Sequence, residues 1–445
     1  MITQSVQSEP STWVDSLIGR FGEPPNFADV RRRAMQAYIE GPSPARVLHL
    51  WRYTDPALFV PSNASLETSA HAVPAASSEL PPTLKVLFDR GEVSAAIHIS
   101  GPGKARIHLS SELQTKGVRV LNLHEAYKQA PELISGHFTK LVGGSVGKEG
   151  VGKFEALNLA LWSAGLVIHV PRNVQVSKPI HVWHSAPNAQ RETFFATRLL
   201  VVAEERSEAT IVDECEGGSD KLKLNAVVEV FAGQSSRVRY VSVQRLHKET
   251  VYHVTERASA AQDAQLLTAM ASLGSSVTKS DFGSHLRGPG SNVELYGFLF
   301  AENRQHFDHH TVHAHESARS YSNLDFKVVL KDRSRSAYTG LIRIEPGCPD
   351  SEAYQENRNL LLNDGAKAES IPELEILTDE VRCTHGATMG TLDDQHIFYL
   401  MSRGLERAEA IRLIVGGFIE PTLSRLEADL QDRLRRIVED RVKDL

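Results

Sequence analysis

Cys383 and His385, in the stretch VRCTHGATMG (381–390), are the residues whose types and spacing are best suited to bind a metal. As residues i and i+2 of an extended strand they would share a face, with Cα atoms about 6.6 Å apart. A thiolate and an imidazole suit iron in a sulfide cluster, or zinc. Two ligands do not complete a coordination shell, and Cys215 and Cys348 lie far along the chain without C-x-x-C spacing. The pair is therefore half of a metal site that a second chain completes, or a buried cysteine near a hydrogen-bonded histidine that binds no metal.

A histidine-rich run, HFDHHTVHAHE (306–316), places His309, His313 and His315 on one face of an expected strand. Three imidazoles on one face could bind Zn²⁺ with an open fourth position. At about 3.3 Å per residue, His309 and His313 are roughly 13 Å apart in one strand, too far to share an ion at ~2.0 Å bond lengths. His313 and His315 could share one. The alternative is that these histidines face solvent or form hydrogen bonds along stacked coils.

Motifs typical of nucleotide binding and of hydrolases are incomplete. GKEGVGKF (147–154) fits G-x-x-x-x-G-K, but Phe154 stands where Mg²⁺ coordination needs Ser or Thr, so we expect a glycine-rich turn before a helix. The sequence contains neither G-x-S-x-G nor H-E-x-x-H, and carboxylate pairs such as Asp393 and Asp394 have no accompanying nucleophile. The residues by themselves do not support catalysis.

The composition is that of an ordinary globular protein, with 445 residues, 41% hydrophobic and 23% charged. The net charge of -6 argues against nucleic acid as the main partner, since phosphate binding needs a basic surface. We expect no membrane span and no signal peptide. Three scattered cysteines argue against a disulfide framework and favour a reducing cytoplasm.

Residues 1–140 are expected to form an N-terminal region of short helices and loops. Segments 11–20 and 29–40 have helical patterns, and the second is followed by Gly41-Pro42. Residues 61–82, rich in Pro, Ser and Ala, are expected to be an exposed linker.

Residues 141–400 are expected to form the main β body. After a helix over 153–164 come short alternating runs that are rich in β-branched residues and separated by turn-forming clusters. These runs are GLVIHVPRNVQV, SKPIHVWH, RLLVVAEE, ATIVDE, LNAVVEVF and RVRYVSVQ, followed later by NVELYGFLF, HHTVHAHE, NLDFKVVL and SAYTGLIRI. The near absence of helical periodicity excludes a βαβ architecture and leaves a sandwich, a propeller or a solenoid. Strands too short to make a core alone favour stacked coils, although no strict repeat period is visible.

Residues 401–445 are expected to be helical. Segment 405–419 has apolar residues at spacings of three and four, Pro421 interrupts the pattern, and 422–442 carries a row of leucines on one face. Such an amphipathic helix either packs on its own domain or docks on a partner.

Residues 355–419 resemble the SufB/SufD family of the SUF iron–sulfur cluster assembly machinery. The motifs NRNLLL, SIPELEI, CTHGAT, FYLMSRG and GGFIEP follow the family's order, and LWRYTD (50–55) and FEALNLALWSAGLVIHVPRNV (154–174) are further landmarks. The resemblance covers most of the chain and is weakest over 1–45 and 61–120. It implies a right-handed parallel β-helix core flanked by N-terminal and C-terminal helical regions.

Within this family the chain is similar to the SufD branch. SufB-type members have a cysteine at the position of Asn357 and the sequence Glu-His-Glu-Ala-Thr where this chain has Thr-His-Gly-Ala-Thr, so that Gly386 replaces a glutamate. The resemblance implies a non-enzymatic scaffold subunit. It further implies that His385 contributes to a nascent iron–sulfur cluster at the interface with a SufB-type subunit, with Cys383 as an auxiliary thiol. The cluster is expected to be transient, and no cofactor is expected to bind the isolated chain tightly.

The resemblance also implies two protein partners. Helices within 404–440 resemble the surface that binds the SufC-type ATPase. Segment 371–382, IPELEILTDEVR, alternates apolar and charged residues as an edge strand does. Strands near 371–385 are therefore expected to pair with a SufB-type subunit or with a second copy of this chain. Two rival functions are a β-helix carbohydrate-active enzyme and a stand-alone zinc protein that uses His309, His313 and His315.

Overall fold

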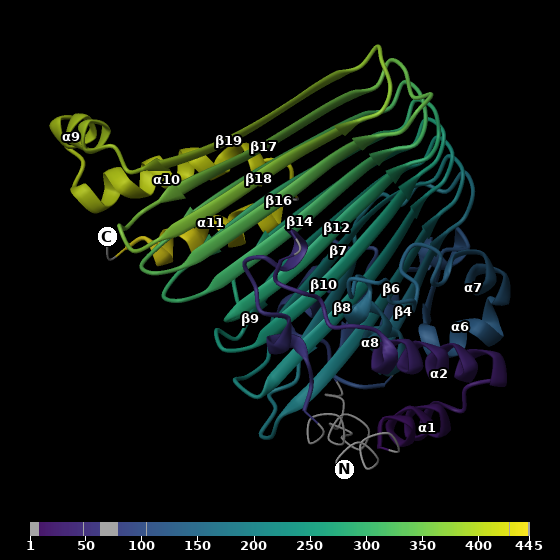
Figure 1. Cartoon of the computed structure of the whole chain (residues 1–445). Helices are drawn as coiled ribbons and strands as arrows, with labels where there is room; N and C mark the ends of the chain where they lie inside the picture. The colour runs from purple at the N-terminus through teal and green to yellow at the C-terminus, as the bar shows by residue number, and fades with distance from the viewer. Residues whose placement is uncertain (1–8, 48, 63–78, 104, 427, 444–445) are drawn as a thin grey trace.

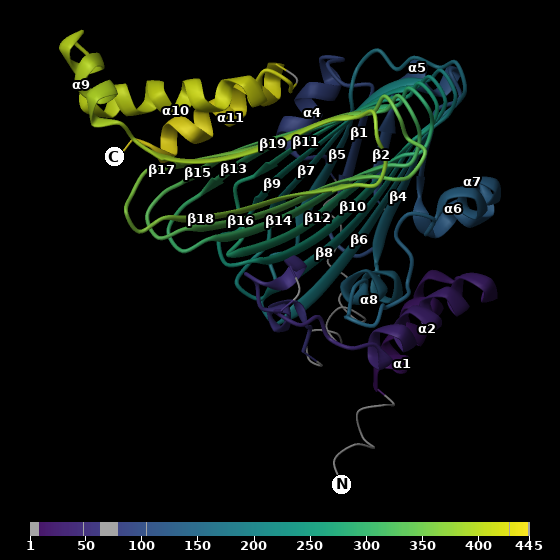
Figure 2. The same ribbon diagram turned by 45° about the horizontal axis from the view of Figure 1, so that its top comes forward.

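The protein is built around a solenoid of stacked β coils with helices on its flanks (Figure 1, Figure 2). The computed structural model describes residues 9–47, 49–62, 79–103, 105–426 and 428–443. Most of the linker expected over 61–82 lies outside these residues. The mainly β fold with parallel coils and terminal helices is confirmed, and the sandwich and propeller alternatives are wrong.

Two sheets form opposite walls of the solenoid. The ten-stranded sheet, ordered β19-β17-β15-β13-β11-β9-β7-β5-β1-β2, consists of β1 (Ala95–Ile99), β2 (Arg106–Leu109), β5 (Ile180–Ala186), β7 (Glu208–Gly217), β9 (Arg237–Leu246), β11 (Gln265–Ser272), β13 (Asn292–Ala301), β15 (Tyr321–Leu330), β17 (Glu352–Leu361) and β19 (Arg382–Thr391). The nine-stranded sheet, ordered β18-β16-β14-β12-β10-β8-β6-β4-β3, consists of β3 (Arg119–Asn122), β4 (Ala164–Val170), β6 (Thr193–Ala203), β8 (Leu222–Ala232), β10 (Val251–Ala260), β12 (Val277–Leu286), β14 (His306–His315), β16 (Arg335–Ile344) and β18 (Lys367–Ile376). From β4 onward, successive strands alternate between the two walls.

Parallel register stacks equivalent residues of successive coils above one another. In β15, for example, Phe326 pairs with Gly297 below it and Asn357 above it. Residues of one parity therefore point into the solenoid from every coil, while the other parity faces outward. The strands that begin the coils in the nine-stranded sheet start at residues 193, 222, 251, 277, 306, 335 and 367, so coil lengths vary from 26 to 32 residues. This variation explains why no strict repeat is visible in the sequence.

The turns between strands contain residues in the left-handed backbone region. They include Asn303 (φ 57°) and Asp332 (φ 62°), two of the residue types that tolerate this conformation best after glycine. The polar clusters that separate the apolar runs in the sequence therefore correspond to the corners of the coils.

Most of the N-terminal helices pack on the outer face of the nine-stranded sheet (Figure 2), whereas the helix over Pro82–Asp89 packs on β1 and β5 of the ten-stranded sheet. The helical elements before the main solenoid are α1 (Glu9–Phe21), α2 (Pro25–Glu40), the 3₁₀ turns His49–Trp51 and Pro56–Phe59, α4 (Pro82–Asp89), α5 (Ser111–Thr115), α6 (Leu123–Gln129), α7 (Pro131–His137) and α8 (Lys153–Leu161). The helices expected over 11–20, 29–40 and 153–164 are confirmed, with α8 ending slightly earlier. Strands β1 to β3 extend both sheets, and the expected domain limits at 140 and 400 stay a prediction.

The G-x-x-x-x-G-K stretch is a turn that leads into α8, as expected. Gly150 (φ 79°) and Gly152 (φ 85°) adopt the left-handed conformation that glycine allows, and Gly152 caps the helix. The Lys153 ammonium donates a hydrogen bond to the Gly41 carbonyl and lies 4.8 Å from the Tyr38 ring centre. This lysine therefore fastens α8 to the end of α2.

The C-terminal region consists of α9 (Asp394–Ser402), α10 (Arg407–Leu423) and α11 (Ala428–Arg441). Helix α10 continues through Pro421 and ends two residues later, so the predicted break at Pro421 is misplaced. A proline in the last turn removes only one of the final hydrogen bonds. The leucine row of α11 packs on the outer face of the ten-stranded sheet, which makes it part of this chain's own core. Among the described residues, no helix has the length and apolar character needed to cross a membrane.

A buried carboxylate fastens α11 to the sheet. Glu214, on the outer face of β7, lies 2.9 Å from the His181 ring and accepts a hydrogen bond of 2.8 Å from Arg433 of α11. Burial alone would raise the pKa of Glu214, but its hydrogen bonds to His181 and Arg433 lower it to about 2. Because this pKa is depressed, the carboxylate contributes its full stabilisation of the docked helix at pH values above the ordinary pKa of a glutamate. The stabilisation is lost as the pH falls toward about 2.

The stack of Phe326 on Gly297 provides a test of the coil register. We expect Phe326→Ala to lower the free energy of unfolding by about 3–5 kcal/mol through the cavity it leaves. Gly297→Ala is expected to lower it by about 1–3 kcal/mol, because a methyl group there would meet the Phe326 ring. Since the double variant has no ring to meet, its loss should be close to that of Phe326→Ala alone. Urea unfolding followed by circular dichroism measures these values, and a double variant with fully additive losses would contradict this packing.

Candidate functional site

The solenoid ends in two edge strands. β18 and β19 are the last strands of their sheets, so no described strand pairs with their outer edges. The expectation of an edge near 371–385 is therefore confirmed. The expected single strand over 371–382 is wrong, because this segment comprises the end of β18, the connection at 377–381 and the first residue of β19. The alternation of apolar and charged residues continues beyond the end of β18, because an apolar residue of the connection, Val381, packs against the core of the last coils.

The last coil exposes its inward face. We call this surface the end face and define it by the inward-pointing residues of the two edge strands, namely Ala368, Ser370, Pro372, Leu374, Cys383, His385, Ala387 and Met389. Their register partners in the coil below, which include Tyr338, Ile342, Ala353 and Gln355, are buried. In the other coils the next coil covers such residues. Here they meet solvent, or a second molecule.

His385 and Cys383 lie on this end face, side by side along β19. His385 is exposed and pairs in register with Gln355, whereas Cys383 is half-buried above Ala353 and touches the interior core. Burial raises the pKa of the Cys383 thiol, so it is protonated at neutral pH. Gly386, the next residue of β19 after His385, has the opposite parity, and no other atom lies within 4 Å of the position that its Cβ would occupy. The His385 ring is thus accessible, and the other face of the strand is also open at this point.

Three amide side chains form the layer beneath the end face. Gln355, Asn357 and Asn359 point inward from β17 and are buried. The Asn359 Nδ2 group donates hydrogen bonds to Asn357 Oδ1 (2.7 Å) and to the Thr388 carbonyl (3.1 Å), and so fastens β19 to β17. Gln355 Oε1, Asn357 Nδ2 and Asn359 Oδ1 have no hydrogen-bond partner among the described residues. Amide residues at 355, 357 and 359 lie at every second position, a pattern that predicts a row of amides on one face of a strand. Sequence reasoning singled out only Asn357.

The histidine run lies inside the solenoid. His309, His313 and His315 point inward from β14 and are fully buried, so their common face is confirmed. Burial lowers the pKa of His309 and His313 to about 3 and that of His315 to about 4, which keeps all three neutral. The ring nitrogens of His315 lie 2.7 and 2.9 Å from the hydroxyls of Ser320 and Ser322.

No grouping for a metal ion was found in the described part of the chain. There, no three or more His, Cys, Asp or Glu residues are arranged so that they could hold one ion. This holds for the histidine run and for the Cys383–His385 pair. Within one chain, the pair stays an incomplete ligand set.

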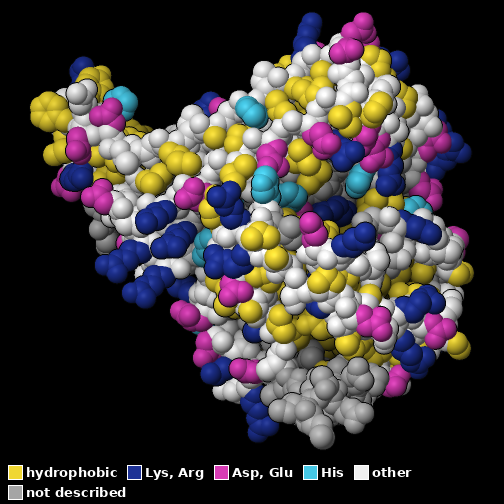
Figure 3. Space-filling model, viewed as in Figure 1, with side chains coloured by type: hydrophobic (Ala, Val, Ile, Leu, Met, Phe, Trp, Pro, Cys, Tyr) yellow, Lys and Arg dark blue, Asp and Glu magenta, His cyan; other side chains and the backbone are white. Residues whose placement is uncertain are grey.

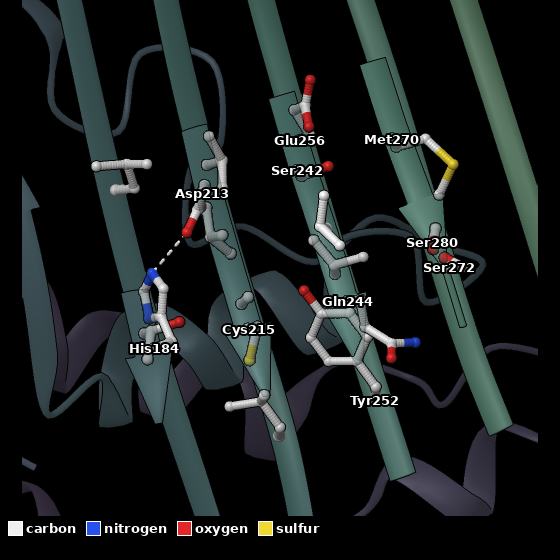
Figure 4. Close-up of a pocket in the computed structure, with 18 of the residues that line it drawn as sticks. His184, Asp213, Cys215, Ser242, Gln244, Tyr252, Glu256, Met270, Ser272 and Ser280 are labelled. Carbon is white, nitrogen blue, oxygen red and sulfur yellow. Dashed lines mark ion pairs between the residues drawn. The ribbon is translucent and has the colours of Figure 1, made fainter. Parts of the chain in front are cut away.

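A second polar region is a cavity of about 50 Å³ in the middle of the solenoid (Figure 4). Asp213 accepts a hydrogen bond from Tyr240 (2.6 Å) and lies 2.8 Å from the His184 ring. Burial and the neighbouring Asp213 raise the pKa of Glu256 to about 8, and burial raises that of the Cys215 thiol. The cavity has room for a few water molecules and none for an organic substrate. Sequence reasoning missed this region because the residues that line the cavity come from eight separate strands.

The C-terminal helices carry an exposed apolar surface. Phe398 of α9 is 72% exposed and Leu413 of α10 is 58% exposed, and Tyr399 and Met401 of α9 are exposed as well. Helix α9 projects from the body of the solenoid (Figure 1). Exposed aromatic and aliphatic side chains on one projecting element indicate a contact surface for another protein.

Comparisons with known proteins agree with this arrangement. The family described as "SUF system FeS cluster assembly, SufBD core domain" matches residues 185–418, and "SufBD protein N-terminal region" matches residues 22–182. The iron–sulfur cluster assembly protein SufD of Bacillus subtilis is 26% identical over 441 residues, covering 97% of each chain. An iron–sulfur cluster assembly SufBD family protein of Staphylococcus epidermidis is 25% identical over 428 residues, covering 94% of this chain and 89% of the relative. With its core and N-terminal region both matched, this chain belongs to the SufBD family of iron–sulfur cluster assembly proteins.

Proposed function

We propose that this chain is a scaffold subunit that contributes His385 to a nascent iron–sulfur cluster, with Cys383 as an auxiliary thiol. The observation that carries the proposal is the position of His385, which is exposed on the terminal strand at the open end of the solenoid. An imidazole buried in the core could not bind a cluster shared with a second chain. The cluster is cargo, assembled and then passed on, and the chain has no enzymatic activity of its own in this scheme.

The incomplete ligand set supports a shared cluster. One imidazole and one thiol supply two ligands, whereas iron in a sulfide cluster is held by several ligands, mostly thiolates. None of the end-face residues carries a carboxylate, and Ala387 and Met389 are the next inward-pointing residues of β19 after His385. The missing thiolate and carboxylate would come from a SufB-type subunit that faces this end.

The edge strands support the proposed mode of docking. The free N–H and C=O groups of β18 and β19 can pair with the edges of a second solenoid. A SufB-type subunit would extend both sheets and bring its own ligands over His385. A second copy of this chain could occupy the same edges, but it would supply only another imidazole and thiol.

The exposed surface of α9 and α10 supports docking of a SufC-type ATPase. The leucines of α11 are buried against the sheet and are not available to a partner. The proposed contact therefore lies on the outer side of α10, within 404–440, and on α9, which directly precedes this range. Nucleotide-driven dimerisation of two ATPase copies would then pull the last coil away from the SufB-type subunit and uncover His385, which that subunit covers in the complex. Cys215, Cys348 and Cys383 are free thiols, which supports a reducing cytoplasmic setting.

Substitution of His385 tests the ligand role. We expect His385→Ala to bind a SufB-type partner normally, since the edge strands are unchanged. Cluster formed on the complex should fall about tenfold or more, because even outer-shell changes alter metal affinity by about 10- to 100-fold. The measurement is anaerobic reconstitution followed by visible absorption and iron content. The matched control is His108→Ala, an exposed histidine on β2 at the opposite end of the same sheet. Normal cluster formation by the His385→Ala complex would remove the proposal.

The raised pKa of Cys383 gives a pH-dependent prediction. Because less thiolate is present at a given pH, Cys383 should react with iodoacetamide more slowly at about pH 8 than an ordinary cysteine of pKa about 8.5. The rate should increase at higher pH, and unfolding in urea should remove the difference. Mass spectrometry of the Cys383 peptide measures the rate. Equal rates in the native and unfolded chain at about pH 8 would contradict this prediction.

The apolar surface of α9 and α10 can be tested separately from the ligand. We expect Phe398→Asp with Leu413→Asp to weaken binding of a SufC-type ATPase by about 30-fold or more, the loss of a central hot spot. The control is Val47→Asp, which places a carboxylate on another exposed apolar side chain. Calorimetric titration of the ATPase measures both. If both variants bind alike, the ATPase docks elsewhere.

A further inference from the structure

Four basic side chains form a row along one corner of the last coils. We call this row the basic ladder; it consists of Arg304, Arg333, Arg335 and Lys367. All four are exposed, and they lie on or directly after the turns that lead into β14, β16 and β18. Lysine and arginine side chains gather over these turns, beside the C-terminal helices (Figure 3).

The coil register sets the spacing of the ladder. Arg335 and Lys367 are register partners in adjacent strands. The Arg333 backbone N–H donates to the carbonyl of Asn303, which directly precedes Arg304, so these two arginines also occupy adjacent coils. Neighbouring coils are about 4.8 Å apart, so the ladder presents one or two cations per coil at that interval.

The ladder is not neutralised within the chain. None of its four side chains has an ion pair or hydrogen bond among the residues that the structure describes. Two carboxylates next to the arginines have other partners, since Asp332 accepts from the Asn303 N–H (2.9 Å) and Glu302 pairs with Lys248 (2.8 Å). A groove of about 750 Å³ runs beside the ladder, and its lining includes the cations Lys248, Arg304 and Arg333 and the carboxylates Glu249 and Asp332. Stacked, unpaired cations repel one another, so a bound anionic partner would relieve this repulsion.

We propose that the basic ladder binds an acidic helix of a protein partner. Carboxylates at positions i, i+3 and i+4 of a helix lie about 5–6 Å apart, which is close to the coil interval. Long polyanions fit less well, because four cations give a short footprint and the chain as a whole carries a net charge of -6. This surface is independent of His385 and does not depend on the proposed ligand role.

Peptide binding to the full-length chain tests the ladder. The probe is a fluorescein-labelled helical peptide with Glu at successive i, i+3 and i+4 positions, and its partner is the same peptide with every Glu replaced by Gln. We expect fluorescence anisotropy to detect binding of the Glu peptide alone. Binding should weaken between about 0.1 M and about 1 M salt, as the Debye length falls from about 10 Å to about 3 Å. Arg304→Glu with Arg333→Glu and Arg335→Glu should weaken it about tenfold or more.

A charge-matched variant separates this surface from the net charge. Arg33→Glu with Arg191→Glu and Arg319→Glu reverses three exposed arginines elsewhere and should bind like the unchanged protein. Circular dichroism confirms that both triple variants are folded. Equal weakening by both triple variants, or no binding of the Glu peptide at all, would overturn the proposal. Ladder-dependent binding of RNA or of vesicles with anionic lipid, in place of the peptide, would overturn it as well.

Discussion

Parallel hydrogen bonding between coils is the interaction on which the rest of this structure depends. Each strand of the solenoid pairs with the strand two places further along the chain, and the register is unbroken from β4 to β19. This pairing satisfies the backbone groups of a coil only if another coil follows. Among the described residues no strand pairs with the outer edges of the final coil, so its backbone groups there are those of an edge strand.

The flanking helices close the other faces of the coil. Most N-terminal helices cover the nine-stranded sheet, while α4 and the C-terminal helices cover parts of the ten-stranded sheet, so apolar residues on the outer faces of both walls are buried within the chain. Buried charges fasten these layers. Glu229 of β8 pairs with Arg198 and accepts from the backbone N–H groups of Thr139, Leu141 and Val142, while Glu214 holds α11. With both walls covered, the end face is left as the open part of the solenoid, and it carries His385.

The interior of the solenoid is more polar than a simple hydrophobic core. Neutral histidines in β14, the amides of β17 and the protonated Glu256 all point into the solenoid, and burial keeps the ionisable groups among them uncharged. Neutral polar groups inside a core require hydrogen bonds but no counter-ions, so they can be accommodated between the stacked coils without a partner of opposite charge. On the surface, by contrast, the basic ladder and the accessible imidazole of His385 are available to other molecules.

Local patterns in the sequence determined the elements, because strand and helix periodicity are properties of neighbouring residues. The alternating runs predicted the strands, and the parity of 383 and 385 placed the thiol and the imidazole on one side of a strand. What only the tertiary structure decided is which residues meet across coils, since register relates positions 26 to 32 residues apart and leaves no local periodicity. It placed Gln355 beneath His385, brought Asp213 near Glu256, and left β19 without a successor, so that an imidazole in an ordinary strand became accessible.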